Sequence, residues 1–244
     1  MRQTQLIMDM PVIVEIADPV KPGIVGGLFD YFHYVDNTFS TFKKMSEITK
    51  INEGLLDASH SNREMREIFR LAEKTKKQTS GYFDIRRGDR IDPSGIVKGW
   101  AIHNAANMLR KAGYTNYYVE AGGDIEVAGS NPEGKSWIIG IRNPFNLKTI
   151  VKKVNLRNCG IATSGIYERG KHIYNPKNNK PVDEIVSLTV IGPNVYEADR
   201  FATAAFAMGK PGIQFIERLK GFEGYMIDAL GIATLTNGFH TYVV

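Results

Sequence analysis

The chain has 244 residues, of which 43% are hydrophobic and 23% are charged, an ordinary composition for a soluble globular protein. The net charge of +5 comes from scattered Lys and Arg residues with only short basic clusters, which favours a solvated surface over a nucleic-acid interface. No apolar run reaches the length of a membrane span, and the N-terminal residues lack the apolar core of a secretory signal. As written, the sequence predicts a cytoplasmic protein with no membrane span and no nucleic-acid partner; an exported protein after signal removal would look the same.

The first half of the chain predicts more helix than strand. The expected elements are a strand at residues 6–16, a helix at 19–35, a polar loop at 36–56 with a helical turn from Ser46, an amphipathic helix at 62–77 and a short strand at 82–85. A further helix is expected to open at residues 92–95, to run to Lys111 and to stop at Gly113.

The second half predicts mainly strands. Strand-like segments are residues 117–127, 137–142, 149–156, 160–162, 186–191, 224–228, 232–235 and 241–244, with helices at 194–209 and 211–219. Because helices and strands alternate without a regular β-α-β period, the predicted fold class is α+β. No linker is evident, so we expect one domain over residues 1–244, with two closely packed lobes of mixed sheets and helices.

The helix at residues 194–209 carries the strongest chemical signal. Asn194 followed by Glu197 resembles a capping box, and alanines at helical spacing predict one buried face. Asp199 and Thr203 lie one turn apart on that face, where a carboxylate needs a cation or strong donors. With a backbone carbonyl they would offer the oxygen ligands that Mg²⁺ prefers. The alternative is an ordinary first-turn acid, with Thr203 bonded back to the preceding turn.

Two glycine-containing stretches indicate close approaches to a ligand. Residues 92–100 place Ser94, Gly95 and Lys98 at a helix start, where free N–H groups and a positive charge would bind an anion, although an ordinary helix cap is the alternative. Gly122 and Gly123 interrupt a strand pattern. We interpret them as a bulge or a close backbone approach to a ligand rather than as a hairpin turn, because apolar residues continue on both sides.

A third stretch, residues 163–165, is a hydroxyl-rich turn, and His172 follows it. The other histidines, His33, His60, His103 and His240, show no metal-ligand spacing, which disfavours a zinc site. The sequence contains no Gly-x-Ser-x-Gly motif, no Walker loop and no Gly-x-Gly-x-x-Gly motif after a strand. Serine hydrolases, P-loop enzymes and Rossmann dehydrogenases are therefore disfavoured.

In their order and spacing, these stretches resemble the ApbE family of FAD:protein FMN transferases, which attach FMN through a phosphoester bond to a threonine or serine of a target protein. The matching segments are residues 8–11, 40–42 with 46–47, 81–84, 92–100, 122–124, 137–144, 162–165 with 167–169, 172–176 and 198–209.

The resemblance implies FAD as substrate, Mg²⁺ as cofactor, AMP as leaving group and an acceptor protein carrying the modified Thr or Ser as partner. It assigns the metal to Asp199, Thr203 and the carbonyl of Val97. The implied catalytic residues are His172, for the acceptor proton, and Asp199. The implied FAD-binding residues are Met8, Phe42, Asp92, Ser94, Gly95, Lys98, Gly122, Gly123, Asp124, Thr163, Ser164 and His172.

The chain departs from the family pattern at its opening Met-Gly-Thr, which is Met8-Asp9-Met10 here, and at a tyrosine that is replaced by Phe42. Phe42 can stack on a flavin but cannot donate a hydrogen bond. Two other functions therefore stay open. The same site could use water and act as an FAD pyrophosphatase yielding FMN and AMP, or the protein could bind flavin without turnover.

Overall fold

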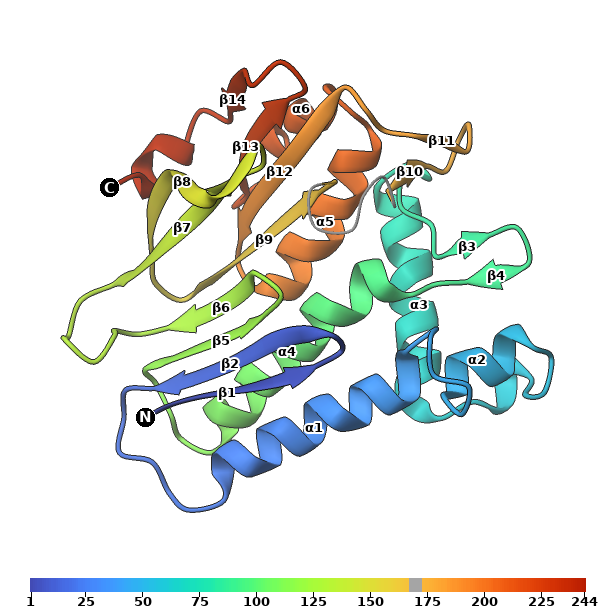
Figure 1. The fold of residues 1–244 in the computed structure, drawn as a ribbon, viewed down its shortest axis with the longest axis horizontal. Helices are drawn as coiled ribbons and strands as arrows, with labels where there is room; N and C mark the ends of the chain where they lie inside the picture. Colours follow the sequence, from blue (N-terminus) through green and yellow to red (C-terminus); the bar gives the residue numbers. More distant parts are fainter. Residues whose placement is uncertain (167–172) are drawn as a thin grey trace.

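The computed structural model describes residues 1–166 and 173–244. Its centre is an eight-stranded antiparallel sheet in the order β1-β2-β5-β6-β9-β12-β13-β14 (Figure 1). The strands are β1 (Arg2–Ile7), β2 (Met10–Ile16), β5 (Tyr117–Ala121), β6 (Asp124–Ala128), β9 (Cys159–Gly165), β12 (Ile185–Gly192), β13 (Glu223–Asp228) and β14 (Ala233–Leu235). β12 is buried along its whole length, which suits a strand in the interior of the sheet.

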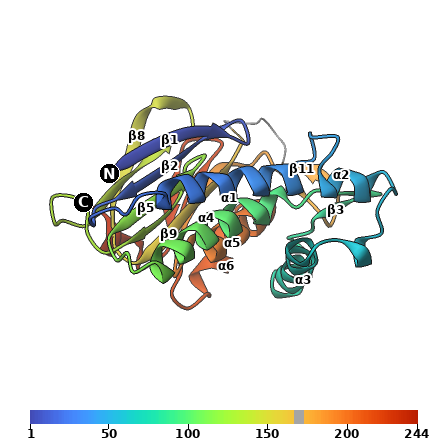
Figure 2. The ribbon, with the colours of Figure 1, turned by 90° about the horizontal axis from the view of Figure 1, so that it is seen from below.

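Helices cover one face of this sheet and a hairpin covers the other (Figure 2). The helices are α1 (Ile24–Phe39), α4 (Ser94–Lys111), α5 (Val195–Ala207) and α6 (Gly212–Glu217), and the hairpin consists of β7 (Trp137–Asn143) and β8 (Asn146–Leu156). Strand residues alternate between the two cores. On β5, Val119 packs toward the helices, whereas Tyr118 packs with Trp137 of the hairpin.

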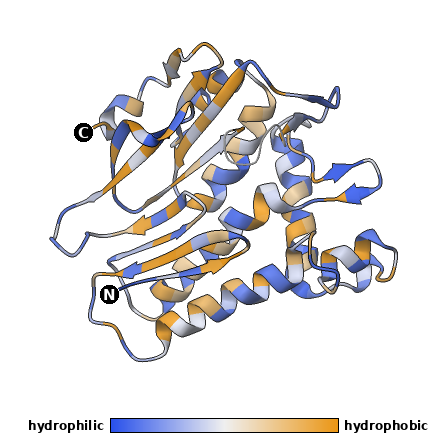
Figure 3. Ribbon diagram, viewed as in Figure 1, coloured by the Kyte–Doolittle hydropathy of each residue, from blue (hydrophilic) through white to orange (hydrophobic). Residues whose placement is uncertain are grey.

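A smaller group of elements continues outward from the end of α1. It contains α2 (Glu47–Asn52), the 3₁₀ helix Ala58–His60, α3 (Arg63–Gln78) and the hairpin β3 (Arg86–Arg87) with β4 (Arg90–Ile91), while β10 (Tyr174–Asn175) pairs with β11 (Lys180–Pro181) nearby (Figure 1). Figure 3 shows the β3–β4 hairpin as hydrophilic, in contrast to the apolar strands of the main sheet. In the part of the chain that the structure describes, no helix is both long enough and apolar enough to cross a bilayer.

The α+β prediction is confirmed, and the strongly capped helices begin where expected. Asn62 accepts a hydrogen bond from the Met65 amide at the start of α3, and Asn194 accepts one from the Glu197 amide at the start of α5. The helix predicted to end at residue 35 continues to Phe39. The division of the chain into one domain with two lobes stays a prediction.

Five local predictions were wrong. Residues 6–16 form a hairpin rather than one strand, because Met8 and Asp9 adopt left-handed φ values of 56° and 57°. Gly122 and Gly123 likewise form a two-residue hairpin turn between β5 and β6, with φ of 55° and 88°, rather than a bulge. Residues 82–85 are irregular, and residues 163–165, expected as a turn, are the end of strand β9. Near the C-terminus, the 3₁₀ helix Phe239–Tyr242 replaces the strand predicted at 241–244.

Candidate active site

The position of Asp199 is set by a close contact between α4 and α5. A Cβ atom on Gly99 would lie 2.6 Å from Asp199 Cβ and 2.9 Å from the Val195 carbonyl oxygen, so only glycine at this position allows the two helices to approach so closely. The Gly99 amide donates a hydrogen bond to Asp199 Oδ2 at 2.8 Å. Asp199 is only 4% exposed, which makes it the buried acid that the helical pattern predicted.

A second buried carboxylate, Asp124, lies beside Asp199. Its Oδ2 atom pairs with Lys98 Nζ at 2.7 Å, and its Oδ1 atom accepts a hydrogen bond from the Thr163 amide at 3.0 Å. Burial raises the pKa of Asp199, and the neighbouring negative charge of Asp124 raises it further, while Lys98 acts in the opposite direction. The site therefore holds two buried carboxyl groups and one partly exposed lysine side chain.

Hydroxyl groups adjoin these acids. Thr203 lies one turn beyond Asp199 on α5, and its Oγ1 atom is 3.4 Å from Ser164 Oγ on β9. A Cβ on Gly95, in the first turn of α4, would be 3.2 Å from the Thr203 methyl group. The first turn of α4, the middle of α5 and the end of β9 thus converge on Thr203.

An open cleft of about 320 Å³ lies on the hairpin side of the sheet and reaches Asp124 of this group. Gly122, Gly123, Asp124 and Thr163 line one part of it, and Trp137 of β7 lines another. The rings of Tyr118 and Trp137 lie 5.5 Å apart between their centroids, and Arg2 and Arg142 also line the cleft. Glu15 and Glu120 line it as well, so its polar lining carries charges of both signs, while the Tyr118 and Trp137 rings are largely buried.

The donor set matches a hard divalent cation. In the described ranges, no three His, Cys, Asp or Glu side chains gather as metal ligands do. Mg²⁺, however, commonly uses only one or two carboxylates and completes its shell with other oxygens, waters and substrate phosphates. The carboxylates of Asp199 and Asp124 and the hydroxyl of Thr203 provide such oxygens, and buried Val97, two residues before Gly99, belongs to the same turn of α4.

The remaining predicted site residues are spread more widely. Phe42 is 92% exposed in the loop after α1, and Met8 occupies the β1–β2 turn. Asp92 accepts a hydrogen bond from the Ser94 amide at 3.0 Å and so caps the start of α4. Lys98, expected to bind an anionic ligand, pairs with Asp124, and its role toward FAD stays a prediction. His172 lies outside the described residues.

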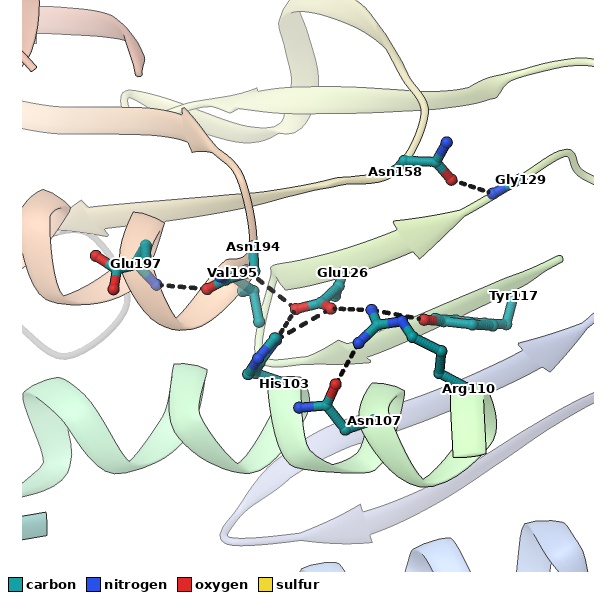
Figure 4. A network of polar contacts seen from close by, with 10 residues as sticks. All are labelled: His103, Asn107, Arg110, Tyr117, Glu126, Gly129, Asn158, Asn194, Val195 and Glu197. Atoms are coloured by element: carbon teal, nitrogen blue, oxygen red, sulfur yellow. Dashed lines mark hydrogen bonds and ion pairs between the residues drawn. The ribbon is translucent and has the colours of Figure 1, made fainter. Parts of the chain in front are cut away.

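Sequence reasoning missed Glu126 and His103. Glu126 is a buried acid on β6 that bonds His103 of α4 (Figure 4). A signal for Glu126 was present, because Asp124 and Glu126 alternate with apolar residues, which places both acids on one face of a strand. His103 showed no metal-ligand spacing, and its partner is a carboxylate.

The family model for ApbE matches residues 86–226. The chain belongs to the ApbE family. It is 31% identical to the FAD:protein FMN transferase of Klebsiella pneumoniae over 163 residues, which are 63% of this chain and 45% of that protein. It is 35% identical to the FAD:protein FMN transferase of Haemophilus influenzae over 148 residues, which are 56% of this chain and 43% of that protein. In these alignments the chain thus spans less than half the length of either relative.

Solved structures agree on the fold. The flavin transferase ApbE from Vibrio cholerae superposes with a TM-score of 0.83 at 21% identity, covering 99% of this chain and 98% of that chain. The apo form of the flavinyl transferase ApbE from Pseudomonas stutzeri gives a TM-score of 0.85 at 21% identity, covering 99% and 96%. The family and fold inferred from the sequence are therefore confirmed.

Proposed function

We propose that this protein transfers the FMN part of FAD to a Thr or Ser hydroxyl of an acceptor protein, with release of AMP and in dependence on Mg²⁺. The observation that carries the proposal is the group of Asp199, Thr203, Asp124 and Lys98, of which Asp124 lines a cleft of about 320 Å³. The relatives named FAD:protein FMN transferase support the same activity.

The reaction joins the acceptor oxygen to the FMN phosphorus and breaks the bond from that phosphorus to the AMP oxygen. The acceptor hydroxyl gives up its proton, and AMP leaves with the electron pair of the broken bond. Bound Mg²⁺ would neutralise phosphate charge and stabilise the leaving group. The residues that we propose to hold it are Asp199, Thr203 and the carbonyl of Val97.

Asp199 and Lys98 prepare the site electrostatically. Burial and Asp124 raise the pKa of Asp199, so its carboxyl group gives up a proton when a cation binds. Lys98 compensates the two acids while no cation is present, and its Nζ atom lies 2.7 Å from Asp124. With anionic phosphates in the cleft, the same ammonium group is placed to attract them.

The cleft supplies orientation. Its backbone at Gly122 and Gly123 carries no side chain, so a phosphate or ring can approach the β5–β6 turn closely. We assign removal of the acceptor proton to His172, as the resemblance implies.

The deciding experiment incubates the protein with FAD, Mg²⁺ and an acceptor protein and then measures flavin fluorescence in a denaturing gel. A fluorescent acceptor band supports transfer. Release of FMN and AMP at the same rate without acceptor would favour the pyrophosphatase, a reaction that Phe42 leaves open because it lacks the family's tyrosine hydroxyl. Persistence of intact FAD in every condition would favour a flavin-binding protein without turnover.

A further inference from the structure

Behind the candidate metal site lies a buried carboxylate that the proposed chemistry does not use. Glu126 is 3% exposed and accepts hydrogen bonds from donors on two helices (Figure 4). On α4, His103 Nδ1 lies 2.9 and 3.1 Å from the two carboxylate oxygens, and Arg110 Nη2 lies 3.4 Å from Oε1. On α5, the Val195 amide donates to Oε2 at 3.1 Å. Because a carboxylate only accepts, His103 carries its proton on Nδ1.

This network is joined to the site through the strand and the helix that it connects. Glu126 lies two residues beyond Asp124 on β6 and therefore faces the same helices. Val195 is the first residue of α5 and stands one turn before Asp199. The two acids of β6 thus contact α5 one turn apart: Glu126 at its N-terminus and Asp124 at Asp199.

The first turn of α5 is packed closely against β9 and α4. A Cβ on Gly160 of β9 would lie 2.0 Å from the Val195 amide nitrogen, and a Cβ on Gly99 of α4 would lie 2.9 Å from the Val195 carbonyl oxygen. Two glycines therefore let β9 and α4 approach the backbone of Val195, the residue whose amide donates to Glu126. The negative charge of Glu126 also interacts favourably with the positive, N-terminal end of the α5 dipole.

We propose that Glu126, oriented by His103, is a positioning residue that fixes the first turn of α5 and thereby sets Asp199 and Thr203 for the divalent cation. This inference rests on the proposed function, because it names what orients the proposed metal ligands. Removing the acceptor leaves the buried Val195 amide unpaired at the helix end, and the turn relaxes to find another partner. Such a rotation displaces Asp199, which cation binding does not tolerate.

The test compares variants of the full chain. Glu126→Leu removes the acceptor at similar volume, whereas Glu126→Gln keeps one oxygen for the Val195 amide. His103→Ala removes the orienting donor from a less buried position and guards against a Glu126→Leu protein that does not fold. Asp18→Leu is the matched control, because Asp18 accepts from the backbone amides of Thr115 and Asn116, which lie away from α5.

Binding of Mn²⁺, followed by electron paramagnetic resonance in the presence of FAD, is the readout, and urea unfolding reports stability. We expect Glu126→Leu to weaken Mn²⁺ binding about tenfold, as the loss of partners around metal ligands does. His103→Ala should weaken it less, Glu126→Gln should retain most of it, and Asp18→Leu should lose stability without losing affinity.

Asp199→Asn separates the two hypotheses. If it abolishes Mn²⁺ binding while Glu126→Leu and His103→Ala bind like the unaltered protein, the positioning role is overturned and the proposed metal site stands. If Asp199→Asn binds Mn²⁺ normally, the proposed metal site itself fails, and the positioning role fails with it. An equal loss of affinity in Asp18→Leu would reduce the role of Glu126 to general stability and overturn the proposal.

Discussion

The Gly99 amide on α4 donates a hydrogen bond to Asp199 Oδ2 on α5 at 2.8 Å, across a helix contact that leaves no room for a Cβ atom on Gly99. This contact holds a carboxylate between two helices and away from water. Asp199 is therefore a buried acid rather than a solvated surface acid, as the proposed cation site requires.

Gly99→Ala should therefore both destabilise the protein and damage the site. The added methyl group forces α4 and α5 apart at Asp199 and at the Val195 carbonyl, and overpacking of this kind costs about 1–3 kcal/mol. Gly26→Ala on α1 is the matched control, since a Cβ there meets nothing within 4 Å. Urea unfolding should show a lower free energy of unfolding for Gly99→Ala and no decrease for Gly26→Ala. Equal free energies of unfolding for the two variants would contradict the steric argument.

Asp199→Asn should change stability in a pH-dependent way when no cation is present. Burial raises the pKa of Asp199 above its ordinary value of 3.8, so the folded state favours the neutral acid. This stabilising contribution is complete below the unfolded pKa and is lost as the pH rises toward the raised folded pKa. Asparagine stays neutral throughout, so the free energy of unfolding of the variant, relative to that of the unaltered protein, should rise with pH.

Urea unfolding in chelator at about pH 4.5 and about pH 8 measures that difference. The variant should be relatively more stable at the higher pH. A difference in stability that is the same at both values would mean that Asp199 does not titrate as a buried acid.

Thr203→Val should weaken the binding of Mg²⁺, because valine keeps the shape of threonine and removes its hydroxyl oxygen. Thr203→Ser retains that oxygen and should behave more like the unaltered protein. The Mg²⁺ concentration for half-maximal FMN transfer should rise about tenfold in Thr203→Val, the effect of losing one contribution of about 1.4 kcal/mol. Equal Mg²⁺ requirements for the two variants would contradict the proposal that the Thr203 hydroxyl binds the metal.

Gly123→Ala should destabilise the β5–β6 turn through conformation alone. Gly123 has φ of 88°, and a Cβ there meets nothing within 4 Å, so the cost is the backbone strain of alanine, about 1–2 kcal/mol. Gly123→Asn should lose less stability than Gly123→Ala, since asparagine tolerates a left-handed backbone conformation better than alanine does. Thermal unfolding compares the two, and an alanine variant as stable as the asparagine variant would contradict this reading of the turn.

Local signals explain which parts of the fold could be predicted. The starts of α3 and α5 follow from Asn62 and Asn194, each of which caps its own helix within three residues. The two missed hairpins turn at Met8-Asp9 and at Gly122-Gly123. Apolar residues occur close to both sides of each turn, so hydropathy alone does not mark the reversal.

The site was predictable only in its local parts. Asp199 and Thr203 share one face of one helix, and the sequence displays that spacing directly. Glu126 and His103 are 23 residues apart and meet because β6 packs against α4, a tertiary contact that no local pattern encodes. Lys98 likewise pairs with Asp124 of a different element, although its position at a helix start suggested an anion.

The most direct test of the central claim is a crystal of the protein with FAD and Mn²⁺, in which anomalous scattering locates the cation. Oxygen ligands of this kind accept Mn²⁺ in place of Mg²⁺. We predict a single strong peak bonded to the Asp199 carboxylate and the Thr203 hydroxyl, with the FAD diphosphate on the same ion. A peak elsewhere, with Asp199 still packed against Gly99 and remote from the diphosphate, would contradict the account.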